Sequence, residues 1–367
     1  MPLPVVLPVA LIGAGKVAHA AHVREIRDLP DDLRLVAVVE RDLAHAAAVT
    51  GGPAGFPDAV VCTDVADAVR AGARAALVCT PWWTHRDVVL ECLAQGLPVL
   101  CEKPVGLDLA EIDEMIAAEA AAQLPVAAGY MKRHDPIVRM FVDHCRAHLD
   151  RARRLTVDIH DPNAPHQVAH LMPYPPPPFG PQPPAARAAL AAALGPQASP
   201  EQQDAYARGL GGSLIHQVNI VHAVLDGSGR ELEGRLLHAD RWAGTDGVGC
   251  RWRPDGELVV DLTHQRLPEH RRYREVLEFT AQDTVATLTL PSPYARDEGA
   301  RLDIDTWDAA GGLADRHTRT AGPGATGFRR QLLAWARSLS GDGPPLPGLA
   351  EVRRDARVMR EAALRLS

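Results

Sequence analysis

The stretch "PVALIGAGKVAHAAHVREI", residues 8–26, joins an apolar run, a glycine-rich turn and a helical pattern. This order is typical of a dinucleotide-binding fold, in which a buried strand passes through a tight turn into a helix. The turn fits G-x-G-x-x-G/A with Gly13, Gly15 and Ala18. Gly13 permits the tight turn, Gly15 lets the backbone approach a pyrophosphate, and the small Ala18 permits close packing of helix on strand. The phosphates would bind at the helix N-terminus, beside Lys16 and Val17.

A second predicted strand, "LRLVAVVERD" at residues 33–42, strengthens this interpretation. It reaches Glu40, 22 residues after Ala18, where such a fold places the carboxylate that accepts hydrogen bonds from the adenosine ribose. The 2′-phosphate of NADP would meet Glu40 as a like charge, which favours NAD. Arg41 leaves NADP possible because a guanidinium pairs well with a phosphate; alternatively Arg41 is solvated or stacks on adenine.

Further apolar strands alternate with helical patterns up to residue 136. The strands are "AALVCT" (75–80), "LPVLCEKP" (97–104) and "LPVAAGYMKRHDP" (124–136), and the helices are "HRDVVLECLAQG" (85–96) and "DLAEIDEMIAAEAAAQ" (108–123). This alternation predicts a parallel sheet covered on both faces, with the cofactor at the carboxyl ends of its strands. Besides the turn, Glu40 and Arg41, we expect the cofactor to contact Thr80, Pro81, Trp82, His85, Glu102, Lys103 and Pro104.

Five motifs in order give the chain a family resemblance. "GAGKVA" (13–18), "VERD" (39–42), "TPWWTH" (80–85), "EKP" (102–104) and "GYMKRHDP" (129–136) make it similar to the Gfo/Idh/MocA family of glucose-fructose oxidoreductase and inositol dehydrogenase. "GFRRQLLAWARSLSGDGPPLP" (327–347) resembles the family's C-terminal pattern. The resemblance implies an α/β protein: an N-terminal Rossmann domain, then an α/β domain with a large, mostly antiparallel, open-faced sheet that commonly supports dimers or tetramers. It also implies hydride transfer on a sugar, cyclitol or keto relative.

The resemblance places Lys103 beside nicotinamide and substrate, often with a cis Lys–Pro peptide. The chemistry asks for such a residue, because hydride transfer at a carbinol carbon requires a proton to move at its oxygen. A lysine next to a cationic nicotinamide in a cleft has its pKa pushed down toward neutrality, and it can also orient the substrate hydroxyl. We therefore expect Lys103 to be catalytic.

Composition and charge exclude several classes of protein. The chain has 367 residues, 46% of them hydrophobic, and a net charge of -7. These values favour a globular protein of two domains and disfavour a nucleic-acid or anionic-membrane binder. Its six cysteines show no paired zinc spacing, and no apolar run approaches the ~20 residues of a membrane span. The apolar start lacks a basic signal-peptide region, so we expect a cytoplasmic protein with reduced thiols.

We expect three parts: a Rossmann domain (1–130), an α/β substrate and oligomerisation domain (131–350) and a C-terminal helix (351–367). Alternating patterns predict strands at "RLTVDIH" (154–160), "LHADRWAG" (237–244), "GELVVDLTH" (256–264) and "TVATLTL" (284–290). A proline-rich insert at 162–200 interrupts them.

The insert begins with a stiff polyproline II stretch, "PYPPPPF" (173–179). A helix from Pro183 to Gly195 should follow, and then a second with Ser199 and Gln202 as a capping box. We interpret the insert as a lid over the substrate or an arm to a neighbouring subunit; a polyproline ligand for another domain is the weaker alternative.

The histidines of the insert raise the question of a metal site. His166 and His170 have the i, i+4 spacing of a metal pair on a helix, with His160 nearby. Pro165 and the missing third ligand motif argue against it, so we expect no metal.

"SLIHQVNIVHAVL", residues 213–225, carries two more histidines on one predicted helix. His222 shares the apolar stripe of Ile215, Val218 and Leu225 and is expected to be a core residue. His216 shares its side with Gly212, Asn219 and Ala223, which suits a wall facing a ligand.

The resemblance adds that this helix usually carries an Asp or Asn and, four residues later, an acid/base His. Here His216 and Ile220 stand at those positions. We expect His216 to act on the substrate beside Lys103, with Asn219 and Arg133 as further substrate ligands and Tyr130 as an alternative proton donor. Lys132 could also reach the site.

The sequence therefore predicts an NAD(P)-dependent oxidoreductase for a polyhydroxylated or keto small molecule, acting as a homodimer or homotetramer through its second sheet. Two alternatives remain. One is a reductase of a non-sugar C=N or C=C group, which the altered Asp/His pair favours. The other is a nucleotide-binding homologue that regulates and does not catalyse, against which the intact Lys103 argues.

Overall fold

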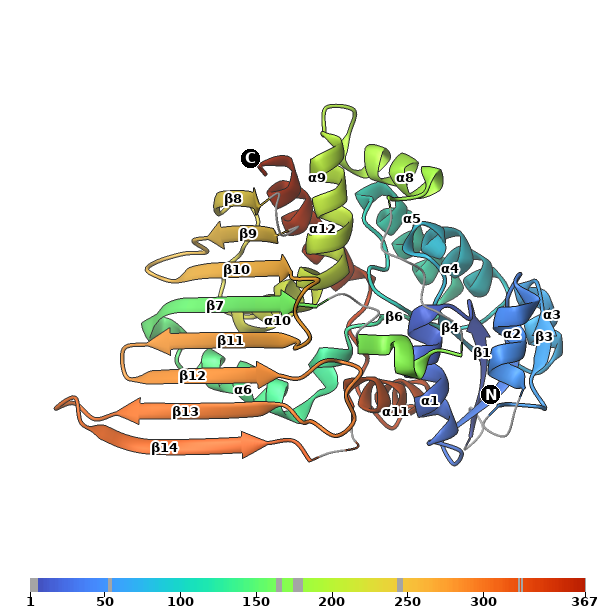
Figure 1. Ribbon diagram of the computed structural model, residues 1–367, viewed down its shortest axis with the longest axis horizontal. Helices are drawn as coiled ribbons and strands as arrows, with labels where there is room; N and C mark the ends of the chain where they lie inside the picture. The colour runs from blue at the N-terminus through green and yellow to red at the C-terminus, as the bar shows by residue number, and fades with distance from the viewer. Residues whose placement is uncertain are drawn as a thin grey trace. The chain divides into compact units, whose positions relative to one another are not determined.

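The computed structural model describes residues 6–51, 55–162, 167–173, 181–242, 247–322, 324 and 326–366 (Figure 1). The chain packs into two units, each with its own β-sheet. The first unit contains residues 1–130, 168–181 and 328–353, and the second contains residues 131–167, 182–327 and 354–367. Within the described ranges, no helix combines the length and apolar character that crossing a membrane requires.

The sheet of the first unit has six parallel strands in the order β3-β2-β1-β4-β5-β6. They are β1 (Leu7–Ile12), β2 (Leu33–Val39), β3 (Val60–Cys62), β4 (Ala75–Val78), β5 (Val99–Cys101) and β6 (Val126–Ala128). All six residues of β1 are buried, as expected for a central strand covered on both faces. The strand order is that of a dinucleotide-binding fold, which confirms the predicted Rossmann domain.

The sequence predicted the helix after the glycine turn and the helices α4 and α5 of this unit, but not α2 and α3. They are η1 (Ala18–His22), α1 (Val23–Arg27), α2 (Leu43–Thr50), α3 (Val65–Arg70), η2 (Trp82–Thr84), α4 (His85–Ala94) and α5 (Leu109–Ala122). Asp42, Asp64 and Asp108 begin α2, α3 and α5, and each carboxylate accepts a backbone N–H of the first turn. Such N-caps satisfy donors that have no partner inside a helix.

Part of the C-terminal region belongs to the first unit, which corrects the expected continuous second domain from 131 to 350. Leu332 and Trp335 of α11 (Gly327–Ser340) are buried in the core of the first unit. The Gln331 side chain also donates a hydrogen bond to the Ala128 carbonyl at the end of β6, at 3.1 Å. The last helix, α12, spans Leu349–Leu364, and the boundary between units falls inside it. The apolar face of α11 predicts burial but not the sheet against which it packs.

The sheet of the second unit has eight strands in the order β14-β13-β12-β11-β7-β10-β9-β8. They are β7 (Ala152–Asp161), β8 (Leu236–Trp242), β9 (Gly247–Trp252), β10 (Val259–Arg266), β11 (Arg274–Ala281), β12 (Thr284–Leu290), β13 (Arg301–Trp307) and β14 (Leu313–Thr320). Only β7 and β10 pair in parallel among these neighbours, so the expected large, mostly antiparallel sheet is confirmed. The sequence patterns located β7, β8, β10 and β12 but not the other four strands.

Helices cover one face of this sheet and leave the other open (Figure 1). Helix α6 (Pro136–Ala147) packs on β12 and β13, and η6 (Tyr206–Leu214) packs on β9 and β10 before the chain enters α10 (Ile215–Leu225). On the open face Asp261 bridges two guanidinium groups, 2.8 Å from Arg154 and 2.5 Å from Arg251. The open face is therefore polar. Short helical turns complete this unit: η3 (Met131–His134) and η4 (Leu149–Arg151). The turn η5 (Ala169–Leu171) belongs to the first unit.

The second half of the proline-rich insert is helical as predicted. Helix α8 (Pro184–Leu194) ends at Gly195, whose φ of 91° favours glycine. Helix α9 (Pro200–Ala205) starts with the reciprocal bonds of Ser199 and Gln202, which confirms the capping box. His166 and most of the expected polyproline stretch lie outside the described residues.

Candidate active site

The glycine turn lies at the carboxyl edge of the first sheet. Gly13 has a φ of 89°, and a Cβ there would lie 2.8 Å from the backbone nitrogen of Thr80, so a side chain at this position is strained and crowded. At Gly15 the nearest atom to a Cβ is the Cys79 carbonyl oxygen at 4.0 Å, and the backbone stays open to a ligand. The next turn, η1, is a π-helix, a distortion frequent at functional sites.

Glu40 directs its carboxylate at this turn from the end of β2. One oxygen accepts the Ala14 N–H at 2.7 Å, and the other accepts the N–H groups of Arg41 at 2.7 Å and Asp42 at 3.0 Å. These bonds hold a negative charge where a dinucleotide fold binds the adenosine ribose. The geometry therefore agrees with the role expected for Glu40.

A pocket opens beside this carboxylate, wholly within the first unit. Of the residues expected at the cofactor, its lining includes Gly13, Gly15, Glu40, Arg41, Thr80 and Pro81. Further side chains line the pocket that were not expected from the sequence, among them His45, Thr63, Asp64, Thr84, Val88 and Glu91. Asp64 follows a strand end, a signal that could have been used; Glu91 lies within a helix and gives no such signal. Glu40, Asp64 and Glu91 make the lining acidic, and Arg41 adds a positive charge to it.

The remaining residues expected at the cofactor do not line this pocket: Lys16, Val17, Ala18, Trp82, His85, Glu102, Lys103 and Pro104. His85 is 1% exposed, and its ring nitrogens lie 2.8 Å from the Thr80 carbonyl and 2.9 Å from the Pro104 carbonyl. Burial lowers the pKa of His85, although both carbonyls favour its protonated form. His85 thus connects the pocket loop to the segment after Lys103; a direct cofactor contact does not fit its burial.

Lys103 follows β5 and is partly exposed, and its peptide bond to Pro104 is cis, as expected. The preceding Glu102 is buried and pairs with His22, whose Nε2 lies 2.7 Å from Glu102 Oε1. Burial raises the pKa of Glu102, but the hydrogen bond and charge of His22, with the charge of Lys103, outweigh it and hold this pKa below its usual value. A carboxylate therefore lies next to the expected catalytic lysine.

Helix α10 in the second unit separates its two histidines as predicted. His222 is 1% exposed, and its Nδ1 lies 2.5 Å from Asp355 Oδ1 in the core, which confirms a core histidine. His216 is 8% exposed, and its action on a substrate stays a proposal.

Asn219 belongs to the same internal network as His222. It is fully buried; its Oδ1 accepts from Arg133 Nη1 at 2.8 Å, and its amide donates to Asp355 Oδ2 at 2.9 Å. Both ends of the amide are thus hydrogen-bonded inside the protein, and the expected substrate contact of Asn219 stays a prediction. The expected substrate contact of Arg133 likewise stays a prediction.

The second unit also holds a buried carboxylate that the sequence analysis missed. Glu275 accepts hydrogen bonds from Lys132 Nζ at 2.5 Å, from Gln217 Nε2 at 2.5 Å and from the Tyr273 hydroxyl. Burial and the charge of Glu275 raise the pKa of Tyr273 well above its usual value, so Tyr273 stays protonated. Three separate segments meet here, and no local sequence signal connects them.

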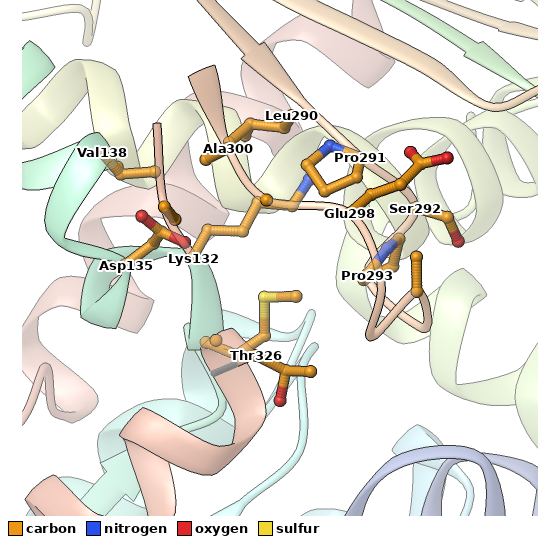
Figure 2. Close-up of a pocket in the computed structure, with 15 residues that line it drawn as sticks. Lys132, Asp135, Val138, Leu290, Pro291, Ser292, Pro293, Glu298, Ala300 and Thr326 are labelled. Carbon is orange, nitrogen blue, oxygen red and sulfur yellow. The ribbon is translucent and has the colours of Figure 1, made fainter. Parts of the chain in front are cut away.

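Lys132 also borders a pocket of the second unit (Figure 2). Its lining comes from η3, the start of α6, the β12–β13 connection and residues 321–327. The Lys132 side chain extends toward Pro291, and Asp135 and Glu298 contribute carboxylates. The lining does not include His216.

Tyr130 ends the first unit and is 1% exposed. Its role as an alternative proton donor stays a prediction beside the expected roles of Lys103 and His216.

Comparisons with known proteins agree with this geometry. Residues 7–130 match the model of the oxidoreductase family with an NAD-binding Rossmann fold, the family that the motifs resemble. The chain is 35% identical over 131 residues to an inositol 2-dehydrogenase of Pseudarthrobacter chlorophenolicus, covering 35% of this chain and 38% of that enzyme. It is 37% identical over 141 residues to inositol 2-dehydrogenase 1 of Saccharopolyspora erythraea, covering 38% of this chain and 40% of that enzyme. The alignments thus span about two fifths of these relatives.

Solved structures show the same fold over nearly the whole chain. A 3-ketoreductase from Actinomadura kijaniata in complex with NADP has a TM-score of 0.70 at 16% identity, covering 98% of both chains. A Gfo/Idh/MocA family oxidoreductase from Vibrio cholerae has a TM-score of 0.65 at 15% identity, covering 98% of this chain and 96% of the other. At these identities the likeness establishes the fold alone.

Proposed function

We propose that the protein is an NAD-dependent oxidoreductase that interconverts a secondary alcohol and a ketone on a cyclitol or sugar-like substrate. The carrying observation is the pocket of the first unit, where Gly13, Gly15 and the fixed Glu40 carboxylate form a dinucleotide site. His85 connects Thr80 of this pocket to Pro104, the neighbour of Lys103. The names of the inositol dehydrogenase relatives support the substrate class.

Lys103 serves as the main proton-transfer group in this proposal. The bound nicotinamide supplies hydride acceptance and donation, and Lys103 takes up or returns the proton of the reacting hydroxyl. Its amine also donates a hydrogen bond that orients the oxygen. The nearby carboxylate of Glu102 opposes loss of the lysine proton, whereas a cationic cofactor favours it.

His216 is proposed as a second group that acts at the reacting oxygen. A neutral imidazole can accept or donate a proton near neutral pH, and His216 is 8% exposed whereas His222 is 1% exposed and lies against Asp355. The catalytic roles of Lys103 and His216 are inferred from residue chemistry and the family resemblance.

NAD is the proposed cofactor, and we expect the protein to use NADP less efficiently. Glu40, Asp64 and Glu91 line the adenosine end of the pocket, and a 2′-phosphate there would meet several like charges. Arg41 is the group that could offset this repulsion.

A second candidate reaction is reduction of a C=N or C=C group, and Ile220 is the observation that favours it. The position where related enzymes usually carry an acid/base histidine is here apolar and fully buried. A changed acid/base set suits a substrate whose reacting atom is not a hydroxyl oxygen.

A panel experiment separates these functions. Purified protein is titrated with NADH and NADPH. Turnover is then followed with NAD or NADP for cyclitols and sugars, and with NADH or NADPH for keto sugars, imines and enones. Turnover of cyclitols or sugars supports the proposal, and turnover confined to imines or enones supports the second candidate. Cofactor binding without any turnover would favour the non-catalytic, regulatory homologue.

We further propose that the protein forms a homodimer or homotetramer through the open face of its second sheet and acts in the cytoplasm. The open face of this eight-stranded sheet, which carries the Arg154–Asp261–Arg251 bridge, is the surface that a second copy would cover.

A further inference from the structure

A histidine and a carboxylate form an isolated pair in the core of the first unit. His22 is fully buried and Glu102 is 5% exposed, and their Nε2–Oε1 distance is 2.7 Å. The ring of Phe328 meets the His22 ring edge-on, with centroids 5.3 Å apart. Neither His22 nor Glu102 lines the dinucleotide pocket.

A gain in the stability of the folded protein does not account for the buried His22–Glu102 pair. Desolvating a carboxylate is costly, and apolar side chains of similar volume often replace buried ion pairs without loss of stability. A buried pair that persists beside an expected catalytic residue therefore points to a role in positioning.

The second oxygen of Glu102 supplies the connection to that residue. Oε2 accepts the backbone N–H of Lys103 at 3.1 Å, while Oε1 faces His22. On the other side, the Pro104 carbonyl faces His85 at 2.9 Å. The peptide that carries the lysine side chain is thus held by Glu102 before it and by His85 after it.

His22 itself belongs to the element that follows the glycine turn. It is the last residue of the π-helix η1, which begins three positions after Gly15. The pair therefore joins the phosphate-binding turn to the segment that carries Lys103.

We propose that His22 is a positioning residue for Lys103 and acts on it through Glu102. The proposal rests on the proposed function, because it concerns the proton that Lys103 would transfer. His22 contributes a hydrogen-bond donor that keeps the Glu102 carboxylate in place. This hydrogen bond also weakens the attraction of the carboxylate for the Lys103 ammonium group.

The charged and titratable groups around Glu102 make the consequence testable. The groups of the first unit that interact with it electrostatically are His22, Lys103, His85, Cys79 and Cys101. Burial raises the pKa of both thiols, so they stay neutral, and it lowers that of His85. Without the His22 donor, the Glu102 carboxylate would interact more strongly with Lys103. This interaction would stabilise the ammonium form of the lysine.

The test compares His22→Leu with His22→Gln, two neutral side chains of which only glutamine keeps an N–H donor. The readout is the pH dependence of acetylation of Lys103 by acetic anhydride, measured by mass spectrometry on the full-length protein. We expect His22→Leu to move labelling to higher pH and to lower kcat about 10- to 100-fold with little change in the KM for NAD. His22→Gln should stay close to wild type in both.

Wild-type labelling in His22→Leu, or equal impairment in His22→Gln, would overturn the proposal. If His22→Leu does not fold, Glu102→Gln replaces it and should move Lys103 labelling to lower pH; no movement contradicts the proposal. Labelling needs no substrate, so a protein without turnover on any substrate refutes the proposed function while the labelling still decides the role of His22.

Discussion

Glu40 fixes the charge of the adenosine end of the pocket, and this gives a prediction for cofactor choice. Replacing Glu40 by Ser removes the carboxylate that a 2′-phosphate would meet. We expect the ratio of kcat/KM for NADP to kcat/KM for NAD to rise at least about tenfold. The reason is that repulsion between like charges in a binding site lowers affinity more than about tenfold. Steady-state kinetics with both cofactors measure this ratio.

Arg41→Ala is the matched variant, since it removes the neighbouring side chain of opposite charge. It should lower the use of NADP and leave NAD nearly unchanged. A Glu40→Ser protein that keeps the wild-type ratio contradicts the role assigned to the carboxylate.

His134 gives the second residue-scale prediction, a dependence of stability on pH. Burial, with the charges of Arg139 and Arg133, lowers the pKa of His134 from 6.5 to about 4. Between these values the unfolded chain binds a proton that the folded chain does not, so stability falls as the pH drops through this window. We expect His134→Gln to reduce the loss of melting temperature between about pH 7 and about pH 5. If His134→Gln loses as much melting temperature as the wild type over this pH range, groups other than His134 cause the loss, which contradicts the prediction.

The residues of the cofactor turn were predictable because each is required by local geometry. Gly13 needs a positive φ, and Glu40 ends a strand at a fixed distance from the turn. His22, His85 and Asn219 illustrate what was not predictable. Their partners lie 80, 19 and 136 positions away, at Glu102, Pro104 and Asp355, and nothing in the neighbouring sequence names them.

At the scale of elements, Glu275 in β11 holds two other segments of the second unit, η3 through Lys132 and α10 through Gln217. Its own segment adds the Tyr273 hydroxyl. Lys132→Met leaves the buried carboxylate without its cation, and we expect a loss of about 3 to 5 kcal/mol in the free energy of unfolding. Urea denaturation measures it.

The double variant Lys132→Met/Glu275→Leu is the control for this prediction. It removes both charges and should recover much of the loss, because a paired apolar replacement avoids the uncompensated charge. A double variant less stable than Lys132→Met would show that the other contacts of Glu275 matter more than its ion pair.

A helix or strand could be predicted where a short stretch of sequence contains its whole pattern of caps or of alternating apolar and polar residues. The capping box at Ser199, the helix from Pro184 and the alternating strand β10 belong to this class. Strand β14 does not, because all eight of its residues are exposed and no alternation marks it. Helix α11 has a clear apolar face, yet only tertiary packing decides that it joins the first unit.

At the scale of the whole molecule, the two units divide the chemistry. The first unit carries the dinucleotide pocket and Lys103, and the second carries His216 and the Glu275 cluster. The fold class followed from the order of motifs, whereas substrate identity depends on side chains contributed by distant segments. The curated relatives match only about two fifths of their length, which is why activity is the claim that most needs a measurement.

The most direct test is the rate at which the purified protein reduces NAD with a panel of cyclitols and sugars, measured by the absorbance of NADH for wild type beside Lys103→Met. NADH titration of both proteins confirms that the variant still binds cofactor. We expect turnover of at least one cyclitol or sugar by the wild type and a loss of about 100-fold or more in Lys103→Met. A wild type that binds NADH but oxidises no member of the panel, or a Lys103→Met protein as fast as the wild type, would contradict it.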